Sequence, residues 1–72
     1  MAELAYEIIQ NIACLSQEYR GWTKELNLIS WNGNKPKYDI RAWSADHKQM
    51  GKGITLTKEE LTALRDVLNE LI

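Results

Sequence analysis

The segment KYDIRAW at residues 37–43 decides the fold, because its side chains alternate in character along the chain. The odd-numbered positions, from Lys37 to Trp43, share one face of an extended strand and are mostly charged. The even-numbered positions, from Tyr38 to Ala42, share the other face and are mostly apolar. This period of two predicts a β-strand with a polar face and an apolar face.

Turn residues on both sides of this segment predict an antiparallel sheet. Residues 22–31 are rich in apolar and aromatic side chains and end at Asn32-Gly33, a pair that tolerates the positive φ angles of a tight hairpin. Residues 22–31 and 36–44 are therefore expected to form a hairpin. After a polar connection, residues 51–57 predict a further short strand centred on Ile54-Thr55-Leu56.

The C-terminal segment predicts an amphipathic helix. Thr57 and Glu60 have the spacing of a capping box, in which each side chain accepts a hydrogen bond from the other residue's backbone N–H. Apolar residues then recur at helical spacing. They require burial against the chain's own sheet or against a second copy of the helix. The residues of this stripe are Leu61, Leu64, Val67, Leu68 and Leu71.

The N-terminal segment fits two interpretations. Leu4, Ile8, Ile12 and Leu15 have the spacing of a helical face, whereas the β-branched residues and Tyr6 favour a strand. The sequence therefore predicts an α+β fold in the order β-β-β-β-α, with the first strand undecided.

Length and composition predict a single domain, residues 1–72, that needs a partner subunit. A chain of this size rarely supplies enough core on its own, and small domains add disulfides, a metal or a second subunit. Cys14 and His47 are the only residues of their types, which argues against an internal disulfide and a zinc site. We expect a buried, inert Cys14, a solvated His47 and no metal or other cofactor. The lone thiol and the lack of a signal peptide favour a cytoplasmic, reducing compartment.

Charge and aromatic residues together point to a polyanionic ligand. Residues 20–56 carry seven Lys or Arg against three acids and contain all three tryptophans, whereas both ends are acidic. Single-stranded nucleic acid exposes bases that stack on aromatic rings, and its phosphates attract Lys and Arg. Lys37, Arg41 and Trp43 alternate on one strand face and meet both needs. Tryptophan can instead fill the core of a small domain, and that alternative stays open here.

No catalytic constellation is visible, so an enzyme is not expected. The main rival to nucleic-acid binding is a dimeric protein-interaction module, because exposed Trp and Arg are also enriched at protein interfaces. No apolar run is long enough to span a bilayer. Neither a membrane nor a small-molecule substrate is expected as a partner.

The chain resembles the positive-cofactor-four family of transcriptional coactivators, and most closely its small bacterial branch, the YdbC-like proteins. The resemblance is carried by residues 37–43, by GKGITLT at residues 51–57 and by the helix that follows. It extends from about Tyr6 to Leu71. One departure is that Ala42 stands before Trp43 where eukaryotic members have two adjacent aromatic residues.

The resemblance implies a curved four-stranded antiparallel sheet followed by one helix, with the first segment a strand. It also implies a symmetric homodimer that binds single-stranded DNA largely without regard to sequence, in transcription regulation, replication or repair. Single-stranded RNA is the variant ligand, and association with the bacterial nucleoid would fit. The expected nucleic-acid-binding residues are Trp22, Lys24, Asn27, Trp31, Lys35, Lys37, Arg41, Trp43 and Lys52. The expected dimer interface is formed by Leu61, Leu64, Leu68 and Leu71.

Overall fold

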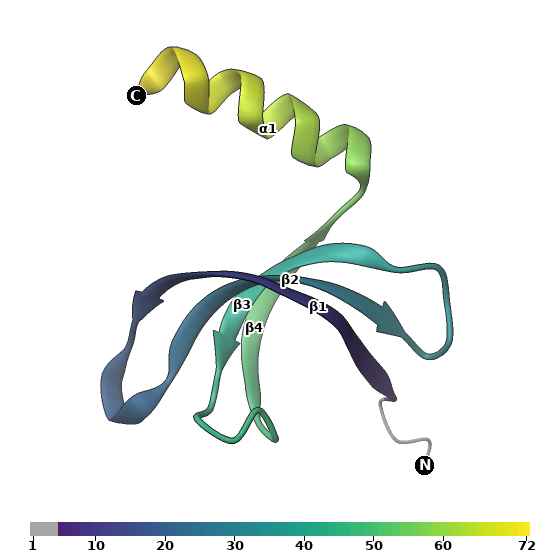
Figure 1. Cartoon of the computed structure of the whole chain (residues 1–72), viewed down its shortest axis with the longest axis vertical. Helices are drawn as coiled ribbons and strands as arrows, with labels where there is room; N and C mark the ends of the chain where they lie inside the picture. Colours follow the sequence, from purple (N-terminus) through teal and green to yellow (C-terminus); the bar gives the residue numbers. More distant parts are fainter. Residues whose placement is uncertain (1–4) are drawn as a thin grey trace.

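The computed structural model describes residues 5–72 as one open antiparallel sheet followed by one helix (Figure 1). The strands lie in the order β1-β2-β3-β4, so every strand pairs with its neighbour in sequence. This confirms the predicted order β-β-β-β-α. The elements are β1 (Tyr6–Gln17), a short 3-10 turn η1 (Tyr19–Gly21), β2 (Thr23–Trp31), β3 (Lys37–Trp43), β4 (Met50–Leu56) and α1 (Lys58–Leu71).

The undecided N-terminal segment is a strand, as the family resemblance implies. β1 has 12 residues and pairs with β2, which has nine. The greater length of β1 is accommodated by register shifts, which lie between Ile8 and Gln10, Asn11 and Ala13, and Cys14 and Ser16. Bulges of this kind bend a strand and increase its twist. Because each bulge interrupts the period of two, Ile8, Ile12 and Leu15 can have helical spacing and still lie on a strongly arched edge strand.

The β2–β3 turn confirms the predicted hairpin. Asn32 and Gly33 have φ angles of 54° and 74°, the left-handed conformation for which the Asn-Gly pair is suited. The Asn34 backbone N–H donates to the Trp31 carbonyl at 2.9 Å and closes the turn. β2 and β3 then pair from Ile29 with Lys37 to Thr23 with Trp43.

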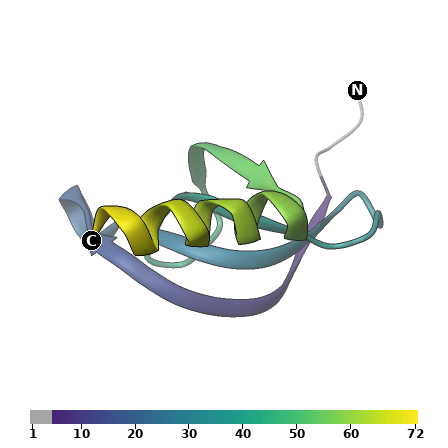
Figure 2. The same cartoon turned by 90° about the horizontal axis from the view of Figure 1, so that it is seen from above.

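Both bonds of the predicted capping box are present at the start of α1. The Glu60 N–H donates to Thr57 Oγ1 at 3.1 Å, and the Thr57 N–H donates to Glu60 Oε1 at 2.8 Å. Figure 2 shows that α1 crosses above the strands, and Figure 1 shows that it stands off the convex face of the sheet. Within residues 5–72 no helix is long and apolar enough to cross a membrane.

The apolar stripe of α1 is largely uncovered in a single chain. Leu61 is half-buried, but no residue of the helix is fully buried, and Val67 and Leu71 are 60% and 74% exposed. A hollow of about 490 Å³ separates the stripe from Leu26 and Ile40 on the sheet. The alternative that the stripe packs tightly on its own sheet is therefore not what the structure shows.

The buried core lies instead under the arch of the sheet, on the concave face opposite α1. The fully or nearly fully buried side chains there come from alternate positions of β2 and β3. Three of the five are polar or charged, so the concave face encloses a hydrogen-bonded interior. They are Glu25, Asn27, Ile29, Asp39 and Trp43.

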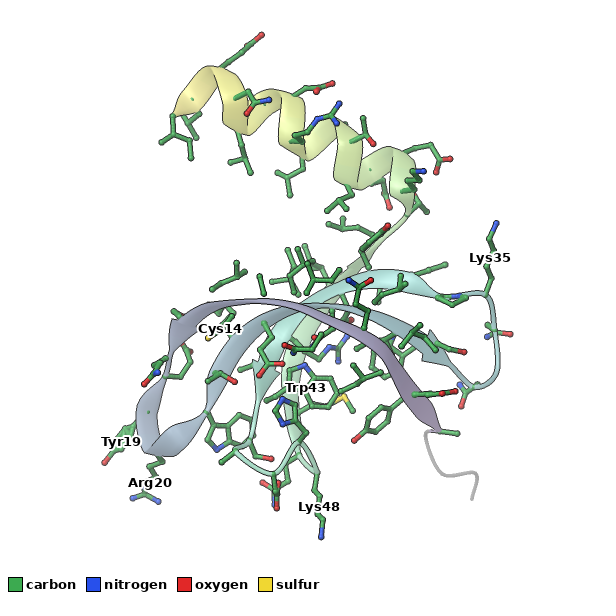
Figure 3. All side chains as sticks on the ribbon, in the orientation of Figure 1. Cys14, Tyr19, Arg20, Lys35, Trp43 and Lys48 are labelled. Carbon is green, nitrogen blue, oxygen red and sulfur yellow. The ribbon has the colours of Figure 1, made fainter. Side chains whose placement is uncertain are left out.

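The structure corrects the expected exposure of Trp43. The alternation of β3 is as predicted, because Asp39, Arg41 and Trp43 share a face. That face is concave, however, and Trp43 lies beneath the arch with no exposed surface (Figure 3). A fully buried ring offers no face to a base.

Cys14 is also placed differently from the expectation of a buried thiol. It lies on β1, an edge strand, and is exposed in the single chain. Its Sγ contacts the Ser16 carbonyl oxygen at 3.5 Å. The apolar neighbours that suggested burial in the sequence are themselves exposed, since Ile12 and Leu15 are 38% and 53% accessible.

Candidate nucleic-acid interface

An open groove of about 510 Å³ lies where β2, β3 and β4 meet near the β2–β3 turn. Trp31 ends β2, the turn adds Lys35, and β3 adds Lys37 at its start and Arg41 further along. The groove therefore combines an aromatic ring with three cations, as stacking and phosphate contacts require. Its lining residues are Trp31, Asn34, Lys35, Lys37, Arg41 and Thr55.

Arg41 is the most firmly held cation of this groove. Its Nε and Nη2 donate to the two carboxylate oxygens of Asp39 at 2.7 and 2.8 Å. Its guanidinium lies over the Trp31 ring, 4.7 Å from the centroid. Asp39 is completely buried and holds one edge of the guanidinium, while Arg41 Nη1 contacts the Gly51 carbonyl oxygen and Met50 Sδ, both at 3.4 Å, so the side chain is fixed where it lines the groove. A fixed planar guanidinium is well suited to a phosphate or a base.

Gly53 allows β4 to approach Arg41 closely. The two residues are paired across β3 and β4. A Cβ at Gly53 would overlap the Arg41 Cβ and the Ile40 carbonyl oxygen. Glycine at this position is therefore needed for the close packing that supports Arg41, which explains its place in the GKGITLT segment.

A chain of aromatic contacts connects the groove to the core. Tyr6 from β1 lies 5.9 Å from Trp31 and 5.4 Å from Trp43, between ring centroids. Trp43 in turn stacks on His47 at 5.8 Å. Such pairs stabilise by more than their buried area alone. Trp43 thus contributes to the interface by supporting Tyr6, which contacts Trp31.

A second buried network is centred on the Glu25 carboxylate. It accepts hydrogen bonds from the Thr23 hydroxyl, from Asn11 Nδ2 at 2.9 Å and from Asn27 Nδ2 at 3.2 Å. His47 Nε2 lies 2.9 Å from its Oε2. Burial disfavours the charged carboxylate, but the hydrogen bonds and His47 outweigh burial and hold the pKa of Glu25 below its ordinary value of 4.5. In residues 5–72, no cluster of three or more His, Cys, Asp or Glu is arranged to hold a metal.

The Glu25 network predicts a loss of stability in acid. Because the pKa is lowered by folding, the stabilising contribution of the ionised carboxylate is complete above the ordinary value of 4.5. It is lost as the pH falls below 4.5 toward the lower folded-state pKa. Urea denaturation at a series of pH values would measure this, with Glu25→Gln as the variant. We expect a shallower pH dependence for the variant below pH 4.5, and an unchanged slope would contradict this role of Glu25.

His47 is more structured than the expected solvated loop residue. Its side chain is 38% exposed, and beyond its pairing with Glu25 its backbone carbonyl accepts from the Tyr6 hydroxyl at 2.9 Å. Its φ of 59° is in the left-handed region. These contacts fix the β3–β4 connection against β1 and β2.

The structure gathers only part of the expected nucleic-acid-binding set. Trp31, Lys35, Lys37 and Arg41 line one groove, as described above. Asn27 is fully buried and bonded to Glu25 and Asn11, so the expectation that it contacts bases is wrong for this conformation.

The other three expected residues lie outside the groove. Lys24 pairs with Ala42, which places it on the convex face. Lys52 alternates with Ile54, whose partner Ile40 is also on that face. Trp22 is half-buried near the opposite end of β2, in a hollow that Tyr19 and Arg20 also line.

Sequence reasoning missed Tyr6, Thr55 and Glu25. A signal for Glu25 was present, since it alternates with Asn27, Ile29 and Trp31 on β2 just as residues alternate on β3. Applying the period of two to β2 would have placed this set together and Lys24 on the other face. Tyr6 could not have been found, because its position depends on the bulges of β1.

The described residues form a four-stranded antiparallel sheet followed by one helix, with an open groove lined by an aromatic ring and three cations. The comparisons with known proteins identify the family of this chain. Residues 19–67 match the family described as Transcriptional Coactivator p15 (PC4), and the chain belongs to this family. It is also similar to an uncharacterized protein of Treponema pallidum (strain Nichols), with 56% identity over 66 residues. That match covers 92% of this chain and 78% of the other protein.

Proposed function

We propose that this chain binds single-stranded DNA as a homodimer, without catalysis and largely without regard to base sequence. The observation that carries the proposal is the groove in which the Arg41 guanidinium lies over the Trp31 ring beside Lys35 and Lys37. Stacking of a base on an aromatic ring contributes about 1–3 kcal/mol and does not depend strongly on base identity. The neighbouring cations would neutralise the phosphates.

Membership of the PC4 family supports nucleic-acid binding and a coactivator-like, non-enzymatic role. The cellular process that we propose is transcription regulation or DNA replication and repair, in the bacterial cytoplasm and in association with the nucleoid. Duplex DNA is a poorer ligand, because the helix of this chain is acidic in its first turn and has no basic recognition face.

The homodimer is supported by the uncovered apolar surface between α1 and the convex face. Leu64 and Leu68 of the helix face Leu26 and Ile40 of the sheet across a hollow, and Leu15 closes one side. Ile29 and Trp43 are the only hydrophobic residues in the described range that are fully buried. A second copy would supply the missing apolar contacts, with Leu61 and Leu71 at the same interface.

Sedimentation equilibrium at low micromolar concentration should therefore give twice the chain mass of 8.3 kDa. Leu68→Glu places a charge in the apolar hollow and should shift the protein toward a monomer of reduced stability. Glu70→Gln on the same helix is the matched control and should remain dimeric. A stable wild-type monomer would contradict the homodimer.

Titration with labelled oligo-dT tests the binding function. Wild type should form a salt-sensitive complex with a slope of log K against log salt of about −2, from three neutralised phosphates at about −0.7 each. Trp31→Ala should weaken binding by about 5- to 150-fold, equivalent to about 1–3 kcal/mol of lost stacking. Trp22→Ala, a tryptophan outside the groove, is the matched control and should change affinity less than twofold. Absence of a wild-type complex at micromolar protein would overturn the proposal.

Two alternatives are separated by simple competition experiments. A preference for oligo-U over oligo-dT at equal length would assign the groove to RNA. A protein partner that is retained after nuclease treatment, and lost in the Trp31→Ala variant, would favour a protein-interaction module. The groove itself favours nucleic acid, since its cations outnumber the single buried carboxylate of Asp39.

A further inference from the structure

A second hollow of about 460 Å³ lies next to the groove and shares two of its lysines. Lys35 and Lys37 line both spaces. The second hollow extends from the β2–β3 turn to the beginning of α1. Figure 3 shows Lys35 projecting from that turn on the side of the sheet where α1 begins. The two hollows therefore form neighbouring parts of one surface around the end of the hairpin.

The second hollow combines an apolar wall with a cationic rim. Leu28, Pro36 and Tyr38 provide apolar and aromatic surface, and Tyr38 is half-buried. Lys58 joins Lys35 and Lys37 on the rim, and Glu59 is the one acid among the lining residues. This is again the pairing of ring and cation that a nucleotide requires.

The three lysines are electrostatically available. The ion pairs among residues 5–72 are Arg41 with Asp39, His47 with Glu25 and Arg65 with Asp66, and none includes a lysine. An ammonium group with no carboxylate partner is free to bind a phosphate at little cost in broken contacts.

Lys58 is also unfavourable for the helix itself. It is the first residue of α1, where the positive end of the helix dipole disfavours a cation and favours the acids that follow at Glu59 and Glu60. A residue that opposes local stability in this way is often kept for a binding role. Lys58 is one of the residues that line the hollow.

We infer that a bound single strand continues from the groove around the β2–β3 turn into the second hollow, where Lys58 binds a phosphate and Tyr38 contacts a nucleoside. This inference rests on the proposed single-strand binding and extends its path. It makes Lys35 and Lys37 the central cations of a longer site, with Arg41 on one side and Lys58 on the other.

The test is a length series of oligo-dT measured by fluorescence anisotropy with wild type, Lys58→Ala and Lys58→Glu. Lys58→Ala should weaken the binding of longer oligonucleotides about threefold at low salt. It should also make the slope of log K against log salt shallower by about 0.7. The shortest oligonucleotides that bind, which fill only the groove, should be unaffected. Lys58→Glu should weaken the binding of the same longer oligonucleotides more than Lys58→Ala does. Neither variant should destabilise α1, because removing a cation from the first helical turn is favourable.

Lys48→Ala is the matched control, since Lys48 is exposed in the β3–β4 connection at the other end of β3. It removes the same charge and should leave affinity and salt slope unchanged. If Lys58→Ala behaves as Lys48→Ala at every length while wild type binds, the inference is overturned and the groove proposal stands. If wild type binds no oligonucleotide, the proposed function fails and the inference fails with it.

Discussion

Trp43→Ala should strongly lower the stability of the fold rather than remove a base-stacking contact. The side chain is completely buried and contacts Tyr6 and His47. Truncating a buried tryptophan costs about 3–5 kcal/mol. A chain of this size has a total stability of roughly 4–11 kcal/mol, at about 0.05–0.15 kcal/mol per residue. Thermal denaturation followed by circular dichroism should therefore show a midpoint at least about 12 °C lower.

Two further substitutions make this prediction specific. Trp43→Phe retains a ring against Tyr6 and should recover most of the lost stability. Trp31→Ala should destabilise less, because Trp31 is only half-buried, but it should weaken oligonucleotide binding more at temperatures where both variants are folded. A Trp43→Ala protein with normal stability and weakened binding would contradict the structural role and restore the surface role expected from the sequence.

Asp39→Ala should weaken both folding and binding, although it removes a negative charge. The carboxylate is fully buried and accepts two hydrogen bonds from Arg41, whose side chain is only 14% exposed. Removing one partner of a buried pair leaves the other uncompensated and costs about 3 kcal/mol or more. Arg41 would also lose the support that holds its guanidinium over Trp31. Urea denaturation and oligo-dT titration measure the two effects.

Whether Asp39→Ala raises or lowers the affinity for oligo-dT shows whether Asp39 acts by positioning Arg41 or only through its charge. If net charge alone governed affinity, losing an acid beside the groove would tighten binding. If Asp39 positions Arg41, affinity falls instead. Asp66→Ala is the matched control, because Asp66 pairs with Arg65 at 3.2 Å on the exposed side of α1. It should change stability by less than about 0.5 kcal/mol. Tighter binding by Asp39→Ala would contradict the positioning role.

Local signals predicted the elements of this fold because each signal depends on few residues. Asn32-Gly33 determines its turn through its own φ angles, and Thr57 with Glu60 caps α1 through two bonds between near neighbours. β1 could not be assigned in the same way. Its bulges break the period of two, and its pairing partners lie in β2, beyond the reach of local patterns.

The sequence separated the two faces of β3 but could not identify the buried one. Charged residues on the face of Asp39 and Arg41 suggested exposure, yet curvature of the sheet encloses that face and leaves Ile54 on the other side 55% exposed. Curvature arises from twist and bulges distributed over the whole sheet. Trp31, Lys35, Lys37 and Arg41 line one groove, whereas Trp43 and Asn27, which were expected at the surface, are fully buried.

The polar interior and apolar exterior of the single chain have a consequence for its heat capacity. Exposing apolar surface raises the heat capacity by about 0.45 cal/K/mol/Å², whereas exposing polar surface lowers it by about 0.26. A lone chain that buries Glu25, Asn27 and Asp39 would therefore unfold with a small heat-capacity change and a flat stability curve. Association of two copies through the apolar surface would add most of the curvature in the plot of stability against temperature. Sensitivity to cold would then be a property of the assembled protein and would depend on its concentration.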